Sequence, residues 1–416
     1  MSDEYETYAP FDSVEGLLQR GRGLGAVRAR QDPEGAAPFV YDGIRRDWRW
    51  DGCDERARYL AGLVRDLGLS PTPVVELLDG DDGQFERAAA VLELLALGGC
   101  DEAREALRAH VREGAHWIHV LESVSDLWPA EWWEDLGEVA RARIGGEPEP
   151  PWFTEPWTRF GIEVQRCDPG PAYEDLTGLS DGELLDLLAG VRPGAGSRVA
   201  ALRELSLREP VEGLIPLVPS LVTGDGGRPL PLLGRAVGHL GPLAVPAARR
   251  WVNDEREWLA RLGSDILADH LGPEVIPVLV AELADQWRAR AWCGPHATAR
   301  RLARFGPAAA AAVADLRRFW LRTPHSYERT DYLKALAAID PEGVARAHTE
   351  SLWDCEEEAR LLGMAHAPDG PETLERITAL REDPMEAPDV RQAAAARLVA
   401  AAATRIPSTA PDEPSC

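Results

Sequence analysis

Apolar residues recur every three or four positions along much of the chain, the spacing that places them on one face of an α-helix. In the first part of the chain this pattern predicts five helices, over residues 54–67, 74–78, 85–97, 101–112 and 117–127. The third ends on Gly98 and Gly99, which tolerate the left-handed backbone that terminates a helix. The pattern therefore predicts an all-α protein.

A dipeptide of glycine, glutamate or aspartate followed by proline repeats in the second half of the chain. Its copies are Glu209-Pro210, Gly241-Pro242, Gly272-Pro273, Gly306-Pro307, Asp340-Pro341 and Gly370-Pro371, with intervals of 32, 31, 34, 34 and 30 residues. Proline is tolerated at the start of a helix, where the amide has no intrahelical partner. Each interval holds two helices, and Pro216, Pro246 and Pro277 predict that the first helices are bent.

This organisation resembles the HEAT-repeat family over residues 181–403. Armadillo-like and bilin-lyase-type repeats share the same features. The resemblance implies a right-handed α-solenoid of stacked antiparallel helix pairs. It also implies binding more often than catalysis, because a stack of short units forms a long concave surface that suits a partner.

Five regions follow from these patterns. Residues 1–45 lack apolar periodicity and are expected to be irregular and mobile. Residues 46–145 form an N-terminal helical region of divergent repeats, and residues 146–180 a linker or packed loop rich in proline and tryptophan. The repeat array occupies residues 181–403, and residues 404–416 form a disordered tail.

Composition limits the setting and the partners. The acidic start lacks the features of a signal peptide, and no apolar run is long enough to span a bilayer. Six cysteines without a C-x-x-C pair indicate reduced thiols, so we expect a cytoplasmic protein. The net charge of −25 makes a nucleic-acid partner unexpected, because phosphate binding depends on basic side chains.

One stretch is nevertheless basic. Residues 286–329 contain nine arginines against Asp315 and Glu328, a net charge of +7. We take it as a candidate site for an anion or an acidic protein partner, formed by Arg288, Arg290, Arg300, Arg301, Arg304, Arg317, Arg318, Trp292 and Trp320. The alternative is that these arginines are solvated and paired with the protein's own acids.

Tryptophan is concentrated elsewhere, with six of the 14 tryptophans between residues 117 and 157. Tryptophan often anchors protein interfaces, so Trp132 and Trp133 are candidate partner contacts. The alternative is that these rings pack the joint between the two halves of the chain. Exposure of Trp132 and Trp133 would favour the interface.

No metal, cofactor or catalytic residue is predicted. His110, Glu113, His116 and His119 share one predicted helix, but no second Glu-x-x-His motif completes a di-iron pattern. Equivalent positions in stacked repeats, such as His239 and His270, lie roughly 10 Å apart, too far to share an ion. The sequence Gly178 to Gly182 matches a nucleophile elbow, but Ser180 and Glu183 are better explained as a helix capping box.

The resulting hypothesis is a non-enzymatic scaffold or adaptor that binds a protein partner, with its oligomeric state left open. The alternative is a nucleic-acid enzyme of the HEAT-repeat DNA-glycosylase type, with Trp128, Trp132 and Asp135 in a basic groove. That alternative requires the tryptophans and the arginines to converge on one concave face.

Overall fold

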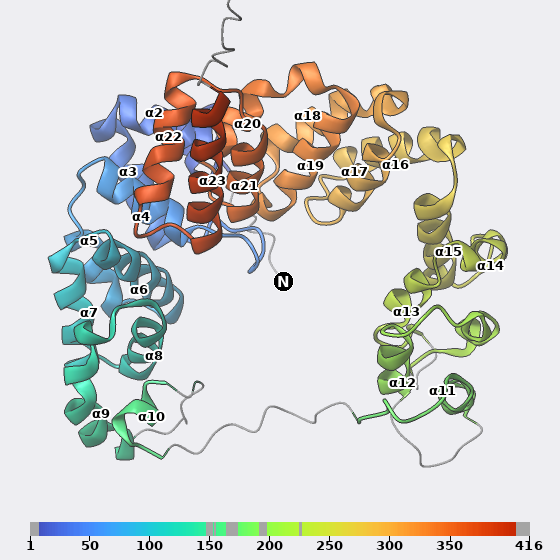
Figure 1. Ribbon diagram of the computed structural model, residues 1–416, viewed down its shortest axis with the longest axis horizontal. Coiled ribbons are helices and arrows are strands. Elements are labelled where there is room, and N and C mark those ends of the chain that lie inside the picture. The colour runs from blue at the N-terminus through green and yellow to red at the C-terminus, as the bar shows by residue number, and fades with distance from the viewer. Residues whose placement is uncertain are drawn as a thin grey trace, which may run out of the picture. The chain divides into compact units, whose positions relative to one another are not determined.

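The computed structural model describes residues 8–146, 153, 155–163, 174–190, 198–223 and 227–404, which are predominantly helical (Figure 1). Within these ranges the only extended pairing is an isolated bridge between Val222 and Pro229. The predicted all-α class is therefore confirmed. None of the described helices is both long and apolar enough to cross a membrane.

Contacts between residues divide the chain into two compact units. Unit 1 joins Met1–Cys167 to Glu282–Cys416, and unit 2 comprises Asp168–Ala281. The repeat array predicted over residues 181–403 is therefore shared between the two units. The tail predicted for residues 404–416 lies outside the described residues apart from Thr404, as does much of the predicted linker, residues 146–180.

Unit 1 begins with three helices where the sequence predicted an irregular segment over residues 1–45: α1 (Val14–Gln19), α2 (Gly23–Gln31) and α3 (Pro33–Arg45). The side chains of Ser13 and Asp32 cap the first and third of these helices. The buried face of α2 consists of glycine and alanine only. The sequence did not predict this helix because its buried face lacks large apolar residues at helical spacing.

The next helices of unit 1 include the five that the sequence predicted. They are α4 (Ala57–Asp66), α5 (Thr72–Val75), η1 (Glu76–Asp79), α6 (Asp82–Leu97), α7 (Asp101–Glu113), α8 (Trp117–Leu127), η2 (Ala130–Trp132), η3 (Glu134–Leu136), α9 (Gly137–Arg143), η4 (Ile144–Gly146) and α10 (Trp157–Phe160), where η marks a 3₁₀ helix. The five helices predicted between residues 54 and 127 are confirmed. Gly98 and Gly99 end α6 as expected, with Gly99 at φ 92°.

Helices from the C-terminal part of the chain complete unit 1. They are the end of α16 (Ile276–Arg288), α17 (Pro295–Ala303), η8 (Gly306–Ala312), α18 (Val313–Arg322), α19 (Ser326–Ile339), η9 (Pro341–Gly343), α20 (Ala345–Ser351), α21 (Glu357–His366), α22 (Pro371–Glu382) and α23 (Pro388–Thr404). Helix α2 contacts α20, which is more than 300 residues later in the chain. Cys355 and Met385 belong to the same buried core as residues of α2 to α8. The two ends of the chain thus fold as one unit.

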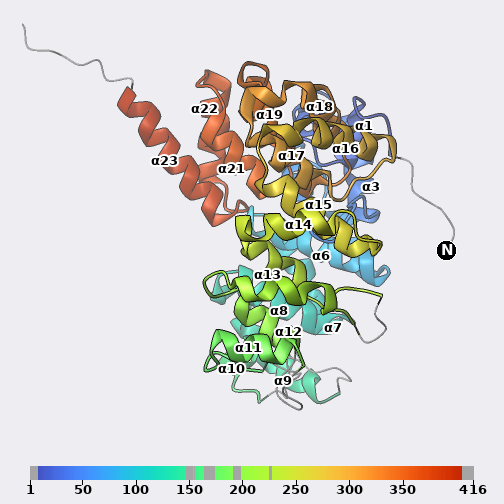
Figure 2. The same cartoon turned by 90° about the vertical axis from the view of Figure 1, so that its right-hand side faces the viewer.

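Unit 2 holds successive helices with a core of their own (Figure 2). They are α11 (Asp181–Leu188), α12 (Arg198–Leu205), η5 (Glu212–Ser220), α13 (Leu233–His239), η6 (Gly241–Ala244), α14 (Val245–Trp251), α15 (Glu257–His270) and η7 (Pro273–Val275), followed by the start of α16. The capping box predicted at Ser180 and Glu183 is present at the start of α11. It confirms that Ser180 is a helix cap.

The Gly-Pro and Asp-Pro signals mark a recurring turn. A 3₁₀ turn with a proline in its first positions begins at Gly241, Pro273, Gly306 and Pro341, and an α-helix follows each one. Pro246 then lies in the first turn of α14, and Pro277 near the start of α16. The prolines therefore do not bend long helices as predicted. In these four units the first element is instead split into a 3₁₀ turn and an α-helix, because a proline needs no donor at a helix start. Pro216 lies inside η5, which is a 3₁₀ helix throughout, and α22 begins directly at Pro371.

Two glycines show that the second helices approach the first helices in the same way. A Cβ on Gly263 of α15 would lie 2.9 Å from the carbonyl oxygen of Ala248, at the end of α14. A Cβ on Gly363 of α21 would lie 2.8 Å from the carbonyl oxygen of His348, at the end of α20. In both pairs the glycine follows the carbonyl by 15 positions. The contact is thus repeated at matching positions.

A third glycine fixes the N-terminal helices on the C-terminal part of unit 1. A Cβ on Gly23 would lie 2.0 Å from the carbonyl oxygen of Glu350 in α20. This contact is between two backbones, so no side-chain rotation can relieve it.

We therefore expect Gly23→Ala to lower the free energy of unfolding by roughly 3 kcal/mol, the upper end of the usual overpacking range. Gly62→Ala is the matched control, because Gly62 lies inside α4 with nothing within 4 Å of a Cβ. It should raise the free energy of unfolding by up to about 1 kcal/mol. Urea denaturation measures both values. Equal effects of the two substitutions would contradict the close contact.

Candidate functional site

In unit 1, buried polar side chains gather at the turns between the first and second helix of each pair. We call the residues 293–296, 323–328, 354–356 and 383–386 the turn ridge. Hydrogen bonds link each turn to the next: Glu328 accepts from the Gly294 amide, Ser326 donates to Glu356, and Arg360 bonds both Glu386 and the Asp354 carbonyl. The turn ridge is therefore continuous through the C-terminal part of unit 1.

The N-terminal part of the chain covers the turn ridge with charged residues. The buried carboxylate of Asp54 accepts hydrogen bonds from His325 Nδ1 at 2.8 Å and the Tyr327 amide at 2.9 Å, and it lies 3.0 Å from Ser326 Oγ. The Arg56 guanidinium donates to Ser326 Oγ at 2.6 Å. These bonds join residues about 270 positions apart in the sequence.

Two buried arginines connect the N-terminal part of unit 1 to its C-terminal part, and one arginine comes from each part. Arg22 comes from the N-terminal part, pairs with Glu350 at 2.6 Å and donates to the Leu321 carbonyl. Arg329 comes from α19, pairs with Asp354 at 2.6 Å and donates to the Arg20 carbonyl. Each guanidinium therefore has a carboxylate from the C-terminal part and a backbone acceptor.

Buried ion pairs of this kind add little net stability, because removing two charges from water costs as much as their attraction returns. Breaking one pair is expensive, however, since the remaining charge is left without a partner. We therefore expect these pairs to favour this position of the N-terminal part over other positions, in which the charges would lack partners.

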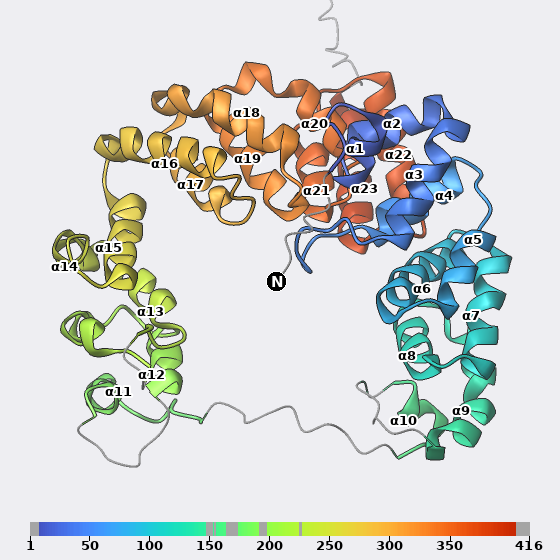
Figure 3. The same cartoon turned by 180° about the vertical axis from the view of Figure 1, so that it is seen from behind.

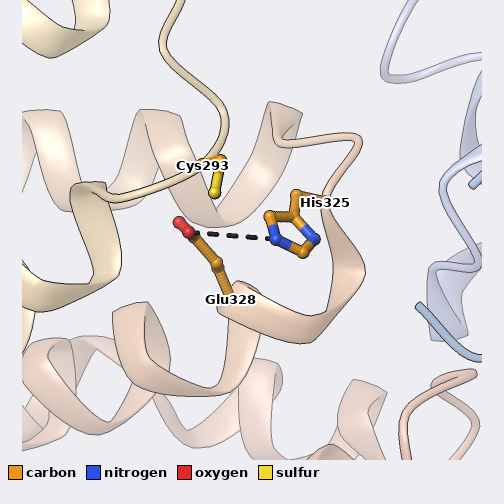
Figure 4. A group of neighbouring side chains, drawn as sticks. All are labelled: Cys293, His325 and Glu328. Atoms are coloured by element: carbon orange, nitrogen blue, oxygen red, sulfur yellow. Dashed lines mark ion pairs between the residues drawn. The ribbon is translucent and has the colours of Figure 1, made fainter. Parts of the chain in front are cut away.

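At one end of the turn ridge, Cys293, His325 and Glu328 point toward one another (Figure 4). Their ligand atoms all lie within 4.8 Å of each other, and His325 Nε2 is 3.9 Å from Glu328 Oε1. His325 and Glu328 are buried, whereas Cys293 is exposed on the turn before α17. The group is thus accessible from solvent through the cysteine.

Hydrogen bonds determine the charges in this group. Burial alone would raise the pKa of Glu328, but bonds from His296, Tyr332 and the Gly294 amide outweigh it and lower the pKa. Burial alone would lower the pKa of His325, but the bond to Asp54 raises it. Desolvation raises the pKa of the Cys293 thiol, and the carboxylates of Glu328 and Asp51 raise it further.

The structure places the predicted arginines on α16 to α18 and the adjoining turns. Four side chains that are 47–74% exposed each face an acid of the same unit: Arg288 with Asp285, Arg300 with Asp331, Arg317 with Asp340 and Arg318 with Asp315. Arg290 and Arg304 are exposed, and Arg301 is half-buried. The alternative interpretation, pairing with the protein's own acids, therefore describes these four.

The two tryptophans proposed beside these arginines contribute to internal packing. Trp292 packs edge-on against Trp287 and Phe319, with ring centroids 5.7 and 6.0 Å apart. Trp320 lies under the guanidinium of Arg22, 4.2 Å from its ring centre. Both rings are half-buried, so neither presents a full face to a partner.

The tryptophans of residues 117–157 also form packing contacts. Trp133 is only 2% exposed and packs against Phe160, and Trp132 is half-buried between Trp128 and Arg104. The exposed Trp132–Trp133 pair that would have favoured an interface is not found. Trp133 is a core residue in this structure.

The residues proposed for a glycosylase do not converge either. Trp128 is buried and donates to the Glu93 carbonyl, and both oxygens of Asp135 are held by Arg108. Helices α8 and α9 lie in a different part of unit 1 from α17 and α18 (Figures 1 and 3). The described residues thus lack the common face that this alternative requires.

Sequence reasoning missed the cluster at Cys293, although a signal was present. Cys293 and His296 are three residues apart, as are His325 and Glu328, and the second pair follows the first by 32 residues. That interval is one repeat, so both pairs occupy the same turn of successive units. The expected separation of roughly 10 Å applies to helix axes. Side chains on turns can lean toward each other and approach much more closely.

Compared with known proteins, the chain matches no family model, no curated protein and no solved structure. Its likeness to HEAT repeats thus rests on its own residues.

Proposed function

We propose that this protein is a non-enzymatic scaffold that binds a protein partner through a HEAT-like, right-handed α-solenoid. The repeated Gly263 and Gly363 contacts and the recurring proline turns support a stack of equivalent helix pairs. In such a stack the concave side is the expected binding surface.

The exposed arginines of α17 and α18 indicate that the partner is acidic. Arg300, Arg317 and Arg318 have side chains 60, 47 and 54% exposed, and each faces an acid of the same unit. Exposed pairs contribute about 0–1 kcal/mol, so a partner's carboxylates can replace the protein's own at little cost. The partner proposed is a protein with an acidic surface segment.

Affinity capture from the native lysate, with and without nuclease and read by mass spectrometry, tests this function. The double variant Arg300→Glu with Arg317→Glu should lose the partner. The matched control, Arg249→Glu with Arg250→Glu, reverses two exposed charges on α14 of unit 2 and should retain it. A partner that survives nuclease, carries an acidic segment and follows this pattern supports the proposal. Retention by the first variant, or capture of nucleic acid alone, overturns it.

A further inference from the structure

We propose that Cys293, His325 and Glu328 bind one zinc ion, with a fourth coordination position open to water. This proposal does not depend on the scaffold function. Cysteine, histidine and glutamate supply the sulfur, nitrogen and oxygen ligands that zinc accepts, and three protein ligands with one open position is an established arrangement.

The geometry requires only small movements. Zinc bonds of 2.0–2.3 Å in a tetrahedron place ligand atoms roughly 3.4–3.6 Å apart. His325 Nε2 and Glu328 Oε1 are already 3.9 Å apart, and all three ligand atoms lie within 4.8 Å of each other. Cys293 is on an exposed turn, so rotation of its side chain can close the remaining distance.

Asp54 prepares His325 for this role. It accepts a hydrogen bond from His325 Nδ1, which leaves Nε2 of the neutral ring with its lone pair toward Glu328 and Cys293. A carboxylate behind a coordinating histidine fixes the ring and increases its basicity, as in many zinc sites. Asp54 is itself oriented by the amides of Trp50 and Asp51.

Glu328 is held with one oxygen directed at the site. Its Oε2 accepts from the Tyr332 hydroxyl at 2.6 Å, while Oε1 faces His325 and accepts from His296 Nδ1 at 2.6 Å. A cation at Oε1 takes the place of the His296 hydrogen bond. His296 is only partly buried, so its ring can turn toward solvent without leaving an unpaired group in the core.

The local charge favours a cation over a catalytic thiolate. An alternative is a catalytic triad, in which Cys293 would be the nucleophile, His325 the base and Asp54 the acid that orients the base. A nucleophile requires a stabilised thiolate, yet the carboxylate of Glu328 lies beside the sulfur, and Asp51 adds a second negative charge. A divalent cation is attracted by the same carboxylates and stabilises the thiolate by direct coordination.

Metal analysis of the full-length protein, dialysed after incubation with zinc, tests the site. We expect one zinc ion per chain in the wild type. Affinity should be at least about 100-fold weaker in Cys293→Ser, because loss of a coordinating thiolate costs at least as much as loss of a residue that only supports a ligand. Cys100→Ser, which alters a half-buried cysteine at the start of α7, is the control and should bind as the wild type does. Cobalt should replace zinc and show a thiolate-to-cobalt absorption band that is lost only in Cys293→Ser.

Alkylation by iodoacetamide adds a readout that does not depend on affinity. Zinc should slow the alkylation of Cys293 at least about tenfold and leave that of Cys100 unchanged, since coordination blocks the thiolate. Absence of stoichiometric zinc, or equal zinc binding by Cys293→Ser, overturns the proposal. Rapid alkylation of Cys293 that zinc does not slow also overturns it and favours a reactive cysteine.

Discussion

Replacing Arg329 by methionine should lower the free energy of unfolding of unit 1 by about 3–5 kcal/mol. The substitution keeps a long apolar side chain but removes the partner of Asp354, which lies 2.6 Å away and is itself buried. It also removes the donor to the carbonyl of Arg20 in the N-terminal part. Urea denaturation measures the loss, and limited proteolysis should cleave the N-terminal part faster in the variant.

Arg318→Met is the control for this substitution. Arg318 pairs with Asp315 at 2.8 Å, but its side chain is exposed, so the change should cost less than about 1 kcal/mol. If the two variants unfolded at the same urea concentration, the buried contact between the N-terminal part and the turn ridge would be excluded as a major determinant of stability.

Replacing Trp157 by alanine should cost about 3–5 kcal/mol as well, the range for a fully buried tryptophan. Its ring is fully buried and meets Trp117 edge-on at 5.8 Å. Its Nε1 donates to the buried Glu122 carboxylate at 2.7 Å, so the variant also removes a hydrogen bond from a charged group. Thermal denaturation followed by circular dichroism measures the effect.

Phe153→Ala distinguishes core from interface in the same region. Phe153 is 65% exposed, and only its backbone amide contacts Glu122, so its loss should leave stability unchanged. A stable Trp157→Ala protein that had lost a binding partner would instead assign this tryptophan to an interface.

The spacing of apolar residues predicted the N-terminal helices from α4 to α8, because their buried residues are large and regularly spaced. Helix α8 begins and ends at the predicted residues, Trp117 and Leu127. Helix α2 escaped prediction because its buried face is made of glycine and alanine, whose burial depends on a close approach to α20 that no local pattern encodes. The solenoid arrangement and the binding function stay predictions.

The candidate metal site escaped prediction for a different reason. Cys293 and His325 are one repeat apart, and the distance between stacked helices was a poor guide for side chains on turns. Asp54 lies 271 positions from His325, and nothing in its own neighbourhood indicates that bond. Contacts between distant segments have no periodic signature, so only the folded structure reveals them.

The packing of the N-terminal helices on the C-terminal part of unit 1 affects the order in which the protein can fold during synthesis. In an open repeat protein each unit contacts only its neighbours and can fold as it leaves the ribosome. Here Arg22 binds Glu350, 328 positions later in the chain. At about 5–20 residues per second, roughly 15–65 s of translation separate these two partners. During that interval the first helices lack the surface that buries their arginines, so this part of the protein reaches its final form only after α20 has been synthesised.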